Sequence, residues 1–422
     1  MEVIRILGGR RLEGEVAIPA SKNAALALLS AVPLIKGPLV LAGLPDISDV
    51  RTKLRLLEIL GVRITEVNGE AHFDTTGASP VEPCEEMMRQ IRTGFYLFGP
   101  LLARFGNAVL PMPGGCPIGD RPVDFHLKGL RAMGADIRIE SGRYVGRCDR
   151  LKGTAIYLDF PSAGATQHLM ATACLAEGIT TIQNAAIEPE VTQLADFLIA
   201  MGARIEGAGT TNISIYGDAP LRGGWAKVPT DRIQAATYLL AGAITNGDVT
   251  VRGVLPEHQI ALLQKLKEAE IIIEEGNDWI RVKSEGRAKG VRVKTMPYPG
   301  FPTDVQQPFS AFLALARGSS LVEETIYESR IGHVQELNRM GAQMKINNRL
   351  TLIDGVSSLR GTTVKASDLR AGAALVLAGL AAEGETIIEN VHYIDRGYEG
   401  LIERLSALDA HVERVTSHRN SL

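Results

Sequence analysis

The sequence predicts an α/β protein of two domains, each built from three repeated units with helices in its interior. Three observations predict this fold class. The chain has 422 residues, too many for one ordinary hydrophobic core. A pattern of strand, apolar helix, strand and charged helix recurs six times along it. Its helices are of two kinds, one apolar on nearly every side and one with charged residues at helical spacing.

The first helix of each unit follows a short strand that ends at Pro, Ser, Thr or Asp. It is rich in Ala and Leu and ends at Gly or Asn-Gly, and its apolar surface predicts that it is buried. The segments with this pattern are 19–37, 161–178, 229–247, 302–318 and 366–384. A sixth segment, 91–106, fits the pattern but begins differently.

A short β-like stretch and a second helix follow each of these segments. The second helices keep charged residues at helical spacing, which predicts that they face solvent. They lie at 50–62, 123–135, 191–203, 258–270, 333–342 and 398–410, and their ends recur roughly every 70 residues. Six such units can close as two domains of three, with sheets and outer helices around the buried helices.

The charge of the chain is nearly balanced, with 45 Lys and Arg against 48 Asp and Glu. This balance indicates neither a nucleic-acid partner nor a membrane surface. Apolar runs such as 371–382 are shorter than the roughly 20 residues needed to cross a bilayer. The first residues alternate like a short strand and lack the pattern of a signal peptide. We therefore expect a cytoplasmic protein without a membrane partner, whose oligomeric state the sequence leaves open.

One of the four cysteines stands in an unusual place. Cys84, Cys148 and Cys174 lack any distinguishing context, and no C-x-x-C pair occurs, so we expect free thiols. Cys116 lies in a loop of Gly and Pro, directly before a helix that begins with Arg-Pro-Val-Asp. Free cysteine is among the residues most often buried, so a thiol at a loop tip indicates a function.

Polar residues gather at the starts of the predicted interior helices. The expected N-caps are Ser21, Ser162, Thr230, Thr303 and Ser367. Close behind them stand Lys22, Asn23, Asp231, Arg232, Asp304, Asp368 and Arg370. Helix starts carry partial positive charge and free N–H groups, so several starts that point the same way would bind an anion. Any one of these charges could equally be a solvated residue near a loop, but the whole set favours an anionic substrate.

The sequence contains none of the usual cofactor or metal signatures. It has no G-x-x-x-x-G-K-[ST] loop and no histidine pair with zincin spacing, and residues 207–212 do not match G-x-G-x-x-G. We therefore expect no cofactor and no metal. Arginine binds phosphate and carboxylate with two parallel hydrogen bonds, so a cluster of arginines suggests a substrate that bears both groups. A nearby carboxylate such as Asp304 could take a proton from a sugar hydroxyl.

Taken together, these segments resemble the enolpyruvyl transferases. The resemblance is carried by "SKNAALALL", "RTGFYLFGPLLARFG", "GGCPIGDRPVDFHLKGLRAMGA", "PSAGAT", "GFPTDVQ" with "ETIYESRIGHVQELNRMGA", and "DLRAGAALVLAGL" with "DRGYEG". It covers essentially the whole chain in order, and the cysteine loop is its most specific part. It implies an inside-out α/β barrel in each of two domains. One domain would be 22–229 and the other 1–21 with 230–422, and the active site would lie in the cleft between them.

The resemblance also implies the reaction and its substrates. The 3′-hydroxyl of UDP-N-acetylglucosamine would add to phosphoenolpyruvate, and phosphate would leave, in the first committed step of peptidoglycan synthesis. No metal or organic cofactor is implied, and these two small molecules are the partners that we expect.

Four residues take catalytic roles when the family's motifs are carried over position by position. Lys22 and Arg396 would hold the phosphate and carboxylate of phosphoenolpyruvate. Asp304 would be the base for the sugar hydroxyl. Cys116 would protonate the methylene carbon or assist product release, and it would be the residue that fosfomycin alkylates.

A larger set would bind the substrates. Arg121 would hold phosphoenolpyruvate together with Lys22 and Arg396, and Arg92 and Arg370 would help. Asn23 would contact the sugar with Asp304. The UDP-sugar would be bordered by the Arg121 to Asp124 segment, with Pro122 and Val123, and by Ser162, Gly164, Ile326 and Arg330. Arg232 and Asp368, at their helix starts, complete the expected substrate-binding residues.

Several positions depart from the family pattern and leave alternatives open. They are Ala20, Ala27, Asp120, Ile187, Gln167 and His168. Such changes are compatible with a paralogue that acts on a different nucleotide or sugar. Transfer to 3-phosphoshikimate would be expected with "SKS" in place of "SKN" and without the cysteine loop. A non-catalytic regulator that binds sugar nucleotides would not need the thiol, and a scaffold for protein partners would expose apolar patches on its outer helices.

Overall fold

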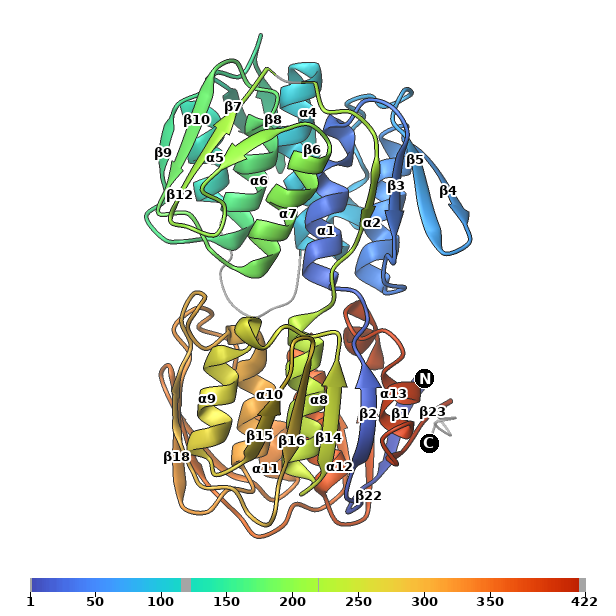
Figure 1. Cartoon of the computed structure of the whole chain (residues 1–422), viewed down its shortest axis with the longest axis vertical. Helices are drawn as coiled ribbons and strands as arrows, with labels where there is room; N and C mark the ends of the chain where they lie inside the picture. Colours follow the sequence, from blue (N-terminus) through green and yellow to red (C-terminus); the bar gives the residue numbers. More distant parts are fainter. Residues whose placement is uncertain (1, 115–122, 219, 417–422) are drawn as a thin grey trace. The chain divides into compact units, whose positions relative to one another are not determined.

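The computed structural model of the chain describes residues 2–114, 123–218 and 220–416, which form two compact units (Figure 1). The 20–229 unit contains the described residues from 20 to 229. The 230–416 unit contains residues 2–19 and 230–416. The chain passes between the units twice, since β2 (Glu13–Ala17) pairs within the 230–416 unit and is followed by α1 (Lys22–Ala31) of the other unit. It returns where β13 (Trp225–Lys227) of the 20–229 unit is followed by α8 (Arg232–Ile244).

The 230–416 unit contains three four-stranded sheets. Their orders are β2-β14-β16-β15, β17-β18-β20-β19 and β21-β22-β1-β23. In each sheet the first pair is parallel and the others are antiparallel. The further strands are β1 (Glu2–Leu7), β14 (Asp248–Arg252), β15 (Ile272–Glu275), β16 (Trp279–Lys283), β17 (Arg292–Lys294), β18 (Ser319–Glu323), β19 (Gln343–Asn347), β20 (Leu350–Asp354), β21 (Thr363–Lys365), β22 (Glu385–Glu389) and β23 (His411–Thr416).

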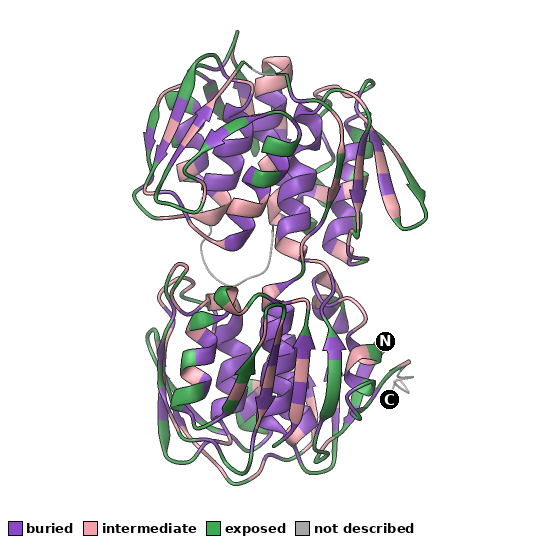
Figure 2. Cartoon of the chain, in the orientation of Figure 1, coloured by how far each residue is buried: buried purple, intermediate pink, exposed green. Residues whose placement is uncertain are grey.

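The interior of this unit is helical, as the apolar segments predict. Helices α8, α10 (Thr303–Leu313) and α12 (Leu369–Ala381) pack against one another, and nearly all of their residues are buried (Figure 2). The outer helices α9 (Ile260–Glu268), α11 (His333–Arg339) and α13 (Leu401–Ser406) bury only one side. Short 3₁₀ turns η3 (Pro256–His258) and η4 (Val391–Arg396) precede α9 and α13. The prediction of two kinds of helix is therefore confirmed.

The 20–229 unit repeats the same plan. Its sheet orders are β13-β3-β5-β4, β9-β10-β12-β11 and, among the described residues, β6-β8-β7. The strands are β3 (Leu39–Ala42), β4 (Arg63–Val67), β5 (Glu70–Asp74), β6 (Asn107–Pro111), β7 (Asp136–Glu140), β8 (Arg143–Arg147), β9 (Ala155–Tyr157), β10 (Ile179–Gln183), β11 (Arg204–Glu206) and β12 (Asn212–Tyr216). The mostly buried helices are α1, α4 (Phe98–Phe105), α6 (Ala163–Ala173) and α7 (Pro189–Ala200). Helix α7 packs against α1 and α6, so it is more buried than the solvent-facing helix predicted for 191–203. The other helical segments are η1 (Val32–Leu34), α2 (Ser48–Ile59), α3 (Glu85–Gln90), η2 (Arg92–Leu97) and α5 (Asp124–Ala132).

Two of the five predicted N-caps are confirmed. The hydroxyls of Ser21 and Ser162 accept hydrogen bonds from the backbone N–H groups of Ala24 and Ala165, both at 3.3 Å. These bonds satisfy donors that the first turn of a helix leaves without an intrahelical partner. Helices α1 and α6 therefore begin where the sequence predicts.

The other three predicted caps, at residues 230, 303 and 367, are wrong by one position. Asp231 caps α8 and Asp368 caps α12, and each carboxylate accepts two backbone N–H bonds. A carboxylate makes stronger charge-assisted bonds to these donors than a hydroxyl does, so the aspartate that follows each Thr or Ser takes the position. Pro302 occupies the N-cap position of α10, and Thr303 is the first residue of that helix.

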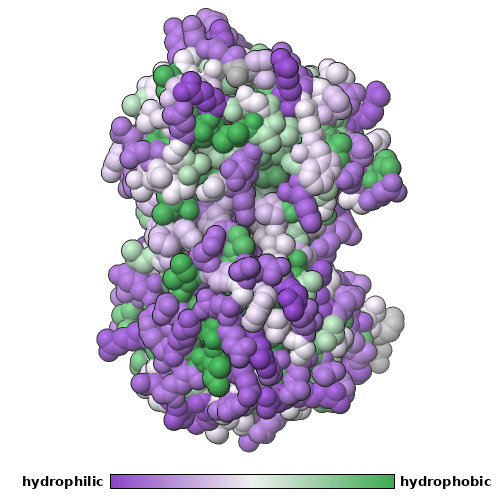
Figure 3. Space-filling model, in the orientation of Figure 1, coloured by the Kyte–Doolittle hydropathy of each residue, from purple (hydrophilic) through white to green (hydrophobic). Residues whose placement is uncertain are grey.

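The molecular surface is mixed in character. Figure 3 shows one face, on which hydrophobic residues occur in small groups among hydrophilic ones. Within the described part of the chain, no helix combines the length and the apolar character that a membrane span requires.

Candidate active site

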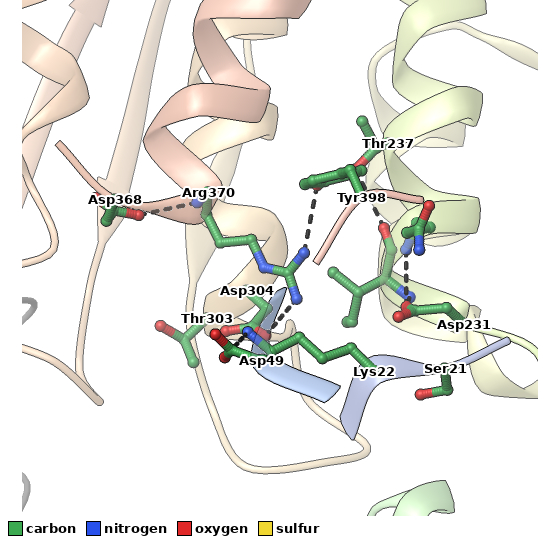
Figure 4. Close-up of polar contacts among 12 residues, drawn as sticks. Ser21, Lys22, Asp49, Asp231, Thr237, Thr303, Asp304, Asp368, Arg370 and Tyr398 are labelled. Carbon is green, nitrogen blue, oxygen red and sulfur yellow. Dashed lines mark hydrogen bonds and ion pairs between the residues drawn. The ribbon is translucent and has the colours of Figure 1, made fainter. Parts of the chain in front are cut away.

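A buried ion-pair cluster lies at the start of the interior helices of the 230–416 unit. Asp304 is the second residue of α10, and one of its carboxylate oxygens lies 2.8 Å from the Arg330 guanidinium. The other lies 2.9 Å from the guanidinium of Arg370 (Figure 4). Arg330 is 5% exposed and Arg370 2%, whereas a quarter of the Asp304 side chain remains accessible. We call these three residues the Asp304 cluster. Its carboxylate is the part that a substrate could reach.

Hydrogen bonds from the Asp304 cluster connect all three interior helices. Arg370, near the start of α12, donates to the Tyr398 hydroxyl at 3.3 Å, and that hydroxyl lies 2.8 Å from the hydroxyl of Thr237 on α8 (Figure 4). The starts of α8, α10 and α12 therefore lie at one end of the unit. Their partial positive charges add to the guanidinium charges there.

The electrostatics of the Asp304 cluster keep its carboxylate ionised. Burial by itself would raise the pKa of Asp304, but the Arg370 and Arg330 guanidiniums outweigh it and hold this pKa well below its usual value. The carboxylate consequently stays ionised near neutral pH. Two guanidiniums thus face one carboxylate within the cluster, and the cap residues Asp231 and Asp368 add negative charge at the neighbouring helix starts.

Glu324 organises the loop that carries two of the predicted site residues. Its buried carboxylate accepts hydrogen bonds from the backbone N–H of Ile326 at 2.8 Å and from that of Tyr327 at 3.1 Å. Its second oxygen accepts a bond from the Thr303 hydroxyl at 2.8 Å, and Thr303 in turn accepts one from Arg330 at 2.8 Å. The carboxylate thus fixes both Ile326 and Arg330 relative to α10. No motif in the sequence indicates this role.

The remaining predicted residues of this unit also lie at helix ends. Arg232 is the first residue of α8, and its guanidinium carbon lies 5.6 Å from the centre of the Tyr298 ring. Asp368 caps α12 through the backbone N–H of Arg370, which explains its position without a substrate. Arg396 ends η4 and is half-buried.

In the 20–229 unit, Lys22 forms an ion pair that the sequence did not predict. Lys22 is the first residue of α1, and its ammonium lies 2.8 Å from a carboxylate oxygen of Asp49 on α2 (Figure 4). A cation at a helix start is repelled by the helix dipole, and the buried Asp49 carboxylate offsets this repulsion. The pair therefore holds the ammonium at the start of α1. Asn23 follows it and is half-buried.

The other predicted residues of this unit stand at the starts of η2, α5 and α6. Arg92 begins η2, which the fully buried Lys53 holds by donating to the Thr93 carbonyl at 2.6 Å. Ser162 caps α6 and Gly164 lies in its first turn. The buried Val123 is the N-cap residue of α5, and the exposed Asp124 is its first helical residue.

Three predicted residues, Cys116, Arg121 and Pro122, lie outside the described residues. Their roles remain predictions from the sequence.

Comparison with known proteins identifies the family. Residues 6–405 match the family described as EPSP synthase (3-phosphoshikimate 1-carboxyvinyltransferase). The chain belongs to this family of enolpyruvyl transferases. Among its relatives, UDP-N-acetylglucosamine 1-carboxyvinyltransferase 3 of Caldanaerobacter subterraneus subsp. tengcongensis is 46% identical over 98% of this chain and 100% of its own. UDP-N-acetylglucosamine 1-carboxyvinyltransferase 2 of Carboxydothermus hydrogenoformans is 47% identical over 99% of this chain and 100% of its own.

Solved structures of enolpyruvyl transferases share the fold. The enolpyruvyl transferase NikO from Streptomyces tendae has a TM-score of 0.88 at 24% identity, and the alignment covers 99% of both chains. EPSP synthase from Acinetobacter baumannii has a TM-score of 0.76 at 22% identity, over 99% of this chain and 100% of that chain. The predicted fold class, an inside-out α/β barrel of repeated units, is therefore confirmed.

Proposed function

We propose that this enolpyruvyl transferase moves the enolpyruvyl group of phosphoenolpyruvate to the 3′-hydroxyl of UDP-N-acetylglucosamine and releases phosphate. The observation that carries the proposal is the Asp304 cluster, an accessible carboxylate set between two buried guanidiniums at converging helix starts. The relatives named for this reaction, at 46% and 47% identity over nearly the whole chain, supply the identity of the substrates.

The reaction needs a base at the sugar and an acid at phosphoenolpyruvate. In our proposal Asp304 accepts the proton of the sugar 3′-hydroxyl while the oxygen of that hydroxyl bonds to C2 of phosphoenolpyruvate. The methylene carbon C3 takes a proton at the same time, which gives a tetrahedral intermediate with a methyl group. The bond between C2 and the phosphate oxygen then breaks, C3 loses a proton, and enolpyruvyl-sugar nucleotide and phosphate remain.

The basic residues at the helix starts would bind the charged groups of phosphoenolpyruvate. Lys22, Arg396 and Arg370, with Arg92 and Arg121, supply the positive charge that a phosphate and a carboxylate require. Fixed positive charge also stabilises the phosphate as it departs, when its negative charge increases. Asp304 and Lys22 act on the same pair of substrates in this proposal.

Cys116 would act as the acid at phosphoenolpyruvate, a role predicted from the sequence alone. A cysteine thiol has an ordinary pKa of about 8.5 and is mostly protonated at neutral pH, so Cys116 can donate a proton to C3. Assistance of product release is the alternative role, and the kinetics of a Cys116 variant distinguish the two.

An acceptor panel tests the proposed function. Purified protein is incubated with phosphoenolpyruvate and either UDP-N-acetylglucosamine, another UDP-sugar or 3-phosphoshikimate, and phosphate and product mass are measured. We expect one phosphate per enolpyruvyl-sugar formed, with UDP-N-acetylglucosamine as the preferred acceptor. Turnover with only another acceptor would indicate a paralogous transferase. Binding of the UDP-sugar without any turnover would indicate a regulator.

Removal of the Lys22 partner tests how phosphoenolpyruvate is held. Asp49→Asn preserves the shape of the side chain but removes the carboxylate that pairs with the ammonium at the start of α1. We expect the KM for phosphoenolpyruvate to change by roughly 10-fold, as for loss of one charge-assisted contact, with the KM for the UDP-sugar within about twofold. Asp46→Asn, which removes an exposed ion pair with Arg51 in the same region, is the matched control and should leave both KM values unchanged. Equal effects of the two substitutions would contradict the positioning of Lys22 by Asp49.

A further inference from the structure

Two buried histidines of the 20–229 unit form a direct hydrogen bond that the proposed mechanism does not use. The Nδ1 atoms of His126 on α5 and His168 on α6 are 2.9 Å apart. The two residues are 6% and 2% exposed.

The proton on each ring follows from a third contact. The backbone N–H of Gly99, in the first turn of α4, donates to Nε2 of His168 at 2.8 Å. That nitrogen therefore carries no proton, and a neutral His168 must carry its proton on Nδ1. His168 then donates to Nδ1 of His126, so a neutral His126 carries its proton on Nε2. One arrangement of protons satisfies the whole chain of contacts.

The surroundings keep both rings neutral. Burial lowers the pKa of His126 to about 3, and the nearby positive charge of Arg92 contributes. Burial also lowers the pKa of His168, with smaller contributions from His126 and Lys53. A further proton on Nδ1 of His126 would face the N–H group of His168 Nδ1 across the 2.9 Å contact, so two donors would oppose each other. The pair therefore stays in its single neutral form around neutral pH.

Close packing fixes the pair from the side of α4. A Cβ atom at Gly99 would lie 2.6 Å from Nε2 of His168 and 2.1 Å from the hydroxyl of Thr172, so only glycine permits this approach. The Tyr96 ring stacks on His168, with centroids 5.9 Å apart, and lies 5.3 Å from the ring of His126. The same tyrosine reaches the start of α6, where a Cβ at Gly164 would come within 2.0 Å of its hydroxyl.

We propose that the His126–His168 pair helps to position the UDP-sugar. The pair does so by holding the first turn of α5 against α6. His126 lies two residues after Asp124, and α6 begins at the Ser162 cap and carries Gly164 in its first turn. The pair thus connects two of the segments that border the nucleotide sugar in the proposed function, on which this inference rests. His126 and His168 act through these segments and touch no reacting atom.

Paired substitutions at His126 separate the hydrogen bond from packing. His126→Phe keeps a ring but removes the acceptor, whereas His126→Asn places an oxygen near the position of Nδ1. We expect His126→Phe to raise the KM for UDP-N-acetylglucosamine roughly 10-fold, as for loss of one buried hydrogen bond, with the KM for phosphoenolpyruvate within about twofold. His126→Asn should restore most of the loss. His72→Phe, on β5 of the same unit, is the control and should have no effect.

The two bonds of His168 can be tested in the same way. His168→Asn keeps a donor near Nδ1 and loses the acceptor for Gly99, whereas His168→Gln keeps that acceptor and loses the donor. We expect His168→Gln to resemble His126→Phe and His168→Asn to remain closer to wild type in the KM for the UDP-sugar. Equal KM effects of the Phe and Asn variants at 126, or parallel rises in both KM values, would overturn the proposal.

Nitrogen NMR of the wild-type protein tests the pair even where a variant fails to fold. Long-range ¹H–¹⁵N spectra should show His168 protonated on Nδ1 and His126 on Nε2, both neutral from about pH 6 to about pH 8. His168 protonated on Nε2, or a cationic ring in this range, would contradict the inference. Activity of the wild type in the acceptor panel keeps this outcome distinct from failure of the proposed function.

Discussion

Replacing Asp304 with asparagine is expected to lower kcat by roughly 100-fold or more, the usual contribution of a positioned general base. The substitution removes the proton acceptor while the side chain keeps its size. It also breaks the ion pairs of Asp304 with the Arg330 and Arg370 guanidiniums, 6% and 3% exposed in their side chains. Loss of these buried pairs should lower the free energy of unfolding by about 3 kcal/mol. Steady-state kinetics and urea denaturation measure the two effects separately.

A second aspartate provides the control for Asp304. Asp248 on β14 accepts hydrogen bonds of 2.7 and 2.8 Å from Arg281. Neither residue belongs to the Asp304 cluster. Asp248→Asn should leave kcat and both KM values near wild type. A change in KM alone at Asp304→Asn, with kcat preserved, would contradict the role of this carboxylate as the base.

Replacing Cys116 with serine is expected to lower kcat by roughly 100-fold and to leave the affinity for the UDP-sugar nearly unchanged. A serine hydroxyl is a far weaker acid than a thiol, so it cannot protonate C3 at a comparable rate. Single-turnover kinetics distinguish slow protonation from slow product release, because only the latter permits a fast first turnover.

The exposed Cys84 is the matched control for Cys116. Cys84→Ser changes the same atom outside the glycine-rich loop and should leave kcat at the wild-type value. Full turnover by Cys116→Ser, or loss of UDP-sugar binding with turnover preserved, would exclude the loop thiol as the acid.

The arrangement of interior and outer helices could be predicted from the sequence because it depends on local composition. A helix that is apolar on every side, such as α12, has no stable position except the interior. The N-caps were predicted less well because neighbouring residues compete for one position. At α8 and α12 an aspartate beside the expected Thr or Ser makes two bonds to the helix start and takes the cap.

The composition of the candidate site could be predicted, but its contacts could not. The motifs predict Asp304, Arg330 and Arg370 one by one, and no sequence feature indicates that one carboxylate joins both arginines. Asp304 and Arg370 are 66 residues apart and meet only because α10 and α12 pack together.

Supporting residues were missed for the same reason. Asp49, Glu324 and the His126–His168 pair belong to no recognisable motif, and their roles follow from neighbours that only the folded chain provides. A buried polar residue must find a hydrogen-bond partner, but sequence spacing does not say which one.

The fate of the bridging oxygen of phosphoenolpyruvate tests the central claim most directly. Phosphoenolpyruvate labelled with ¹⁸O between C2 and phosphorus is incubated with the protein and UDP-N-acetylglucosamine, and both products are weighed by mass spectrometry. Enolpyruvyl transfer breaks the bond from C2 to oxygen, so the label should appear in the released phosphate and the sugar nucleotide should gain an unlabelled enolpyruvyl group. Label retained in pyruvate, with no enolpyruvyl-sugar formed, would mean that the bond from phosphorus to oxygen is broken instead, and would contradict the proposed activity.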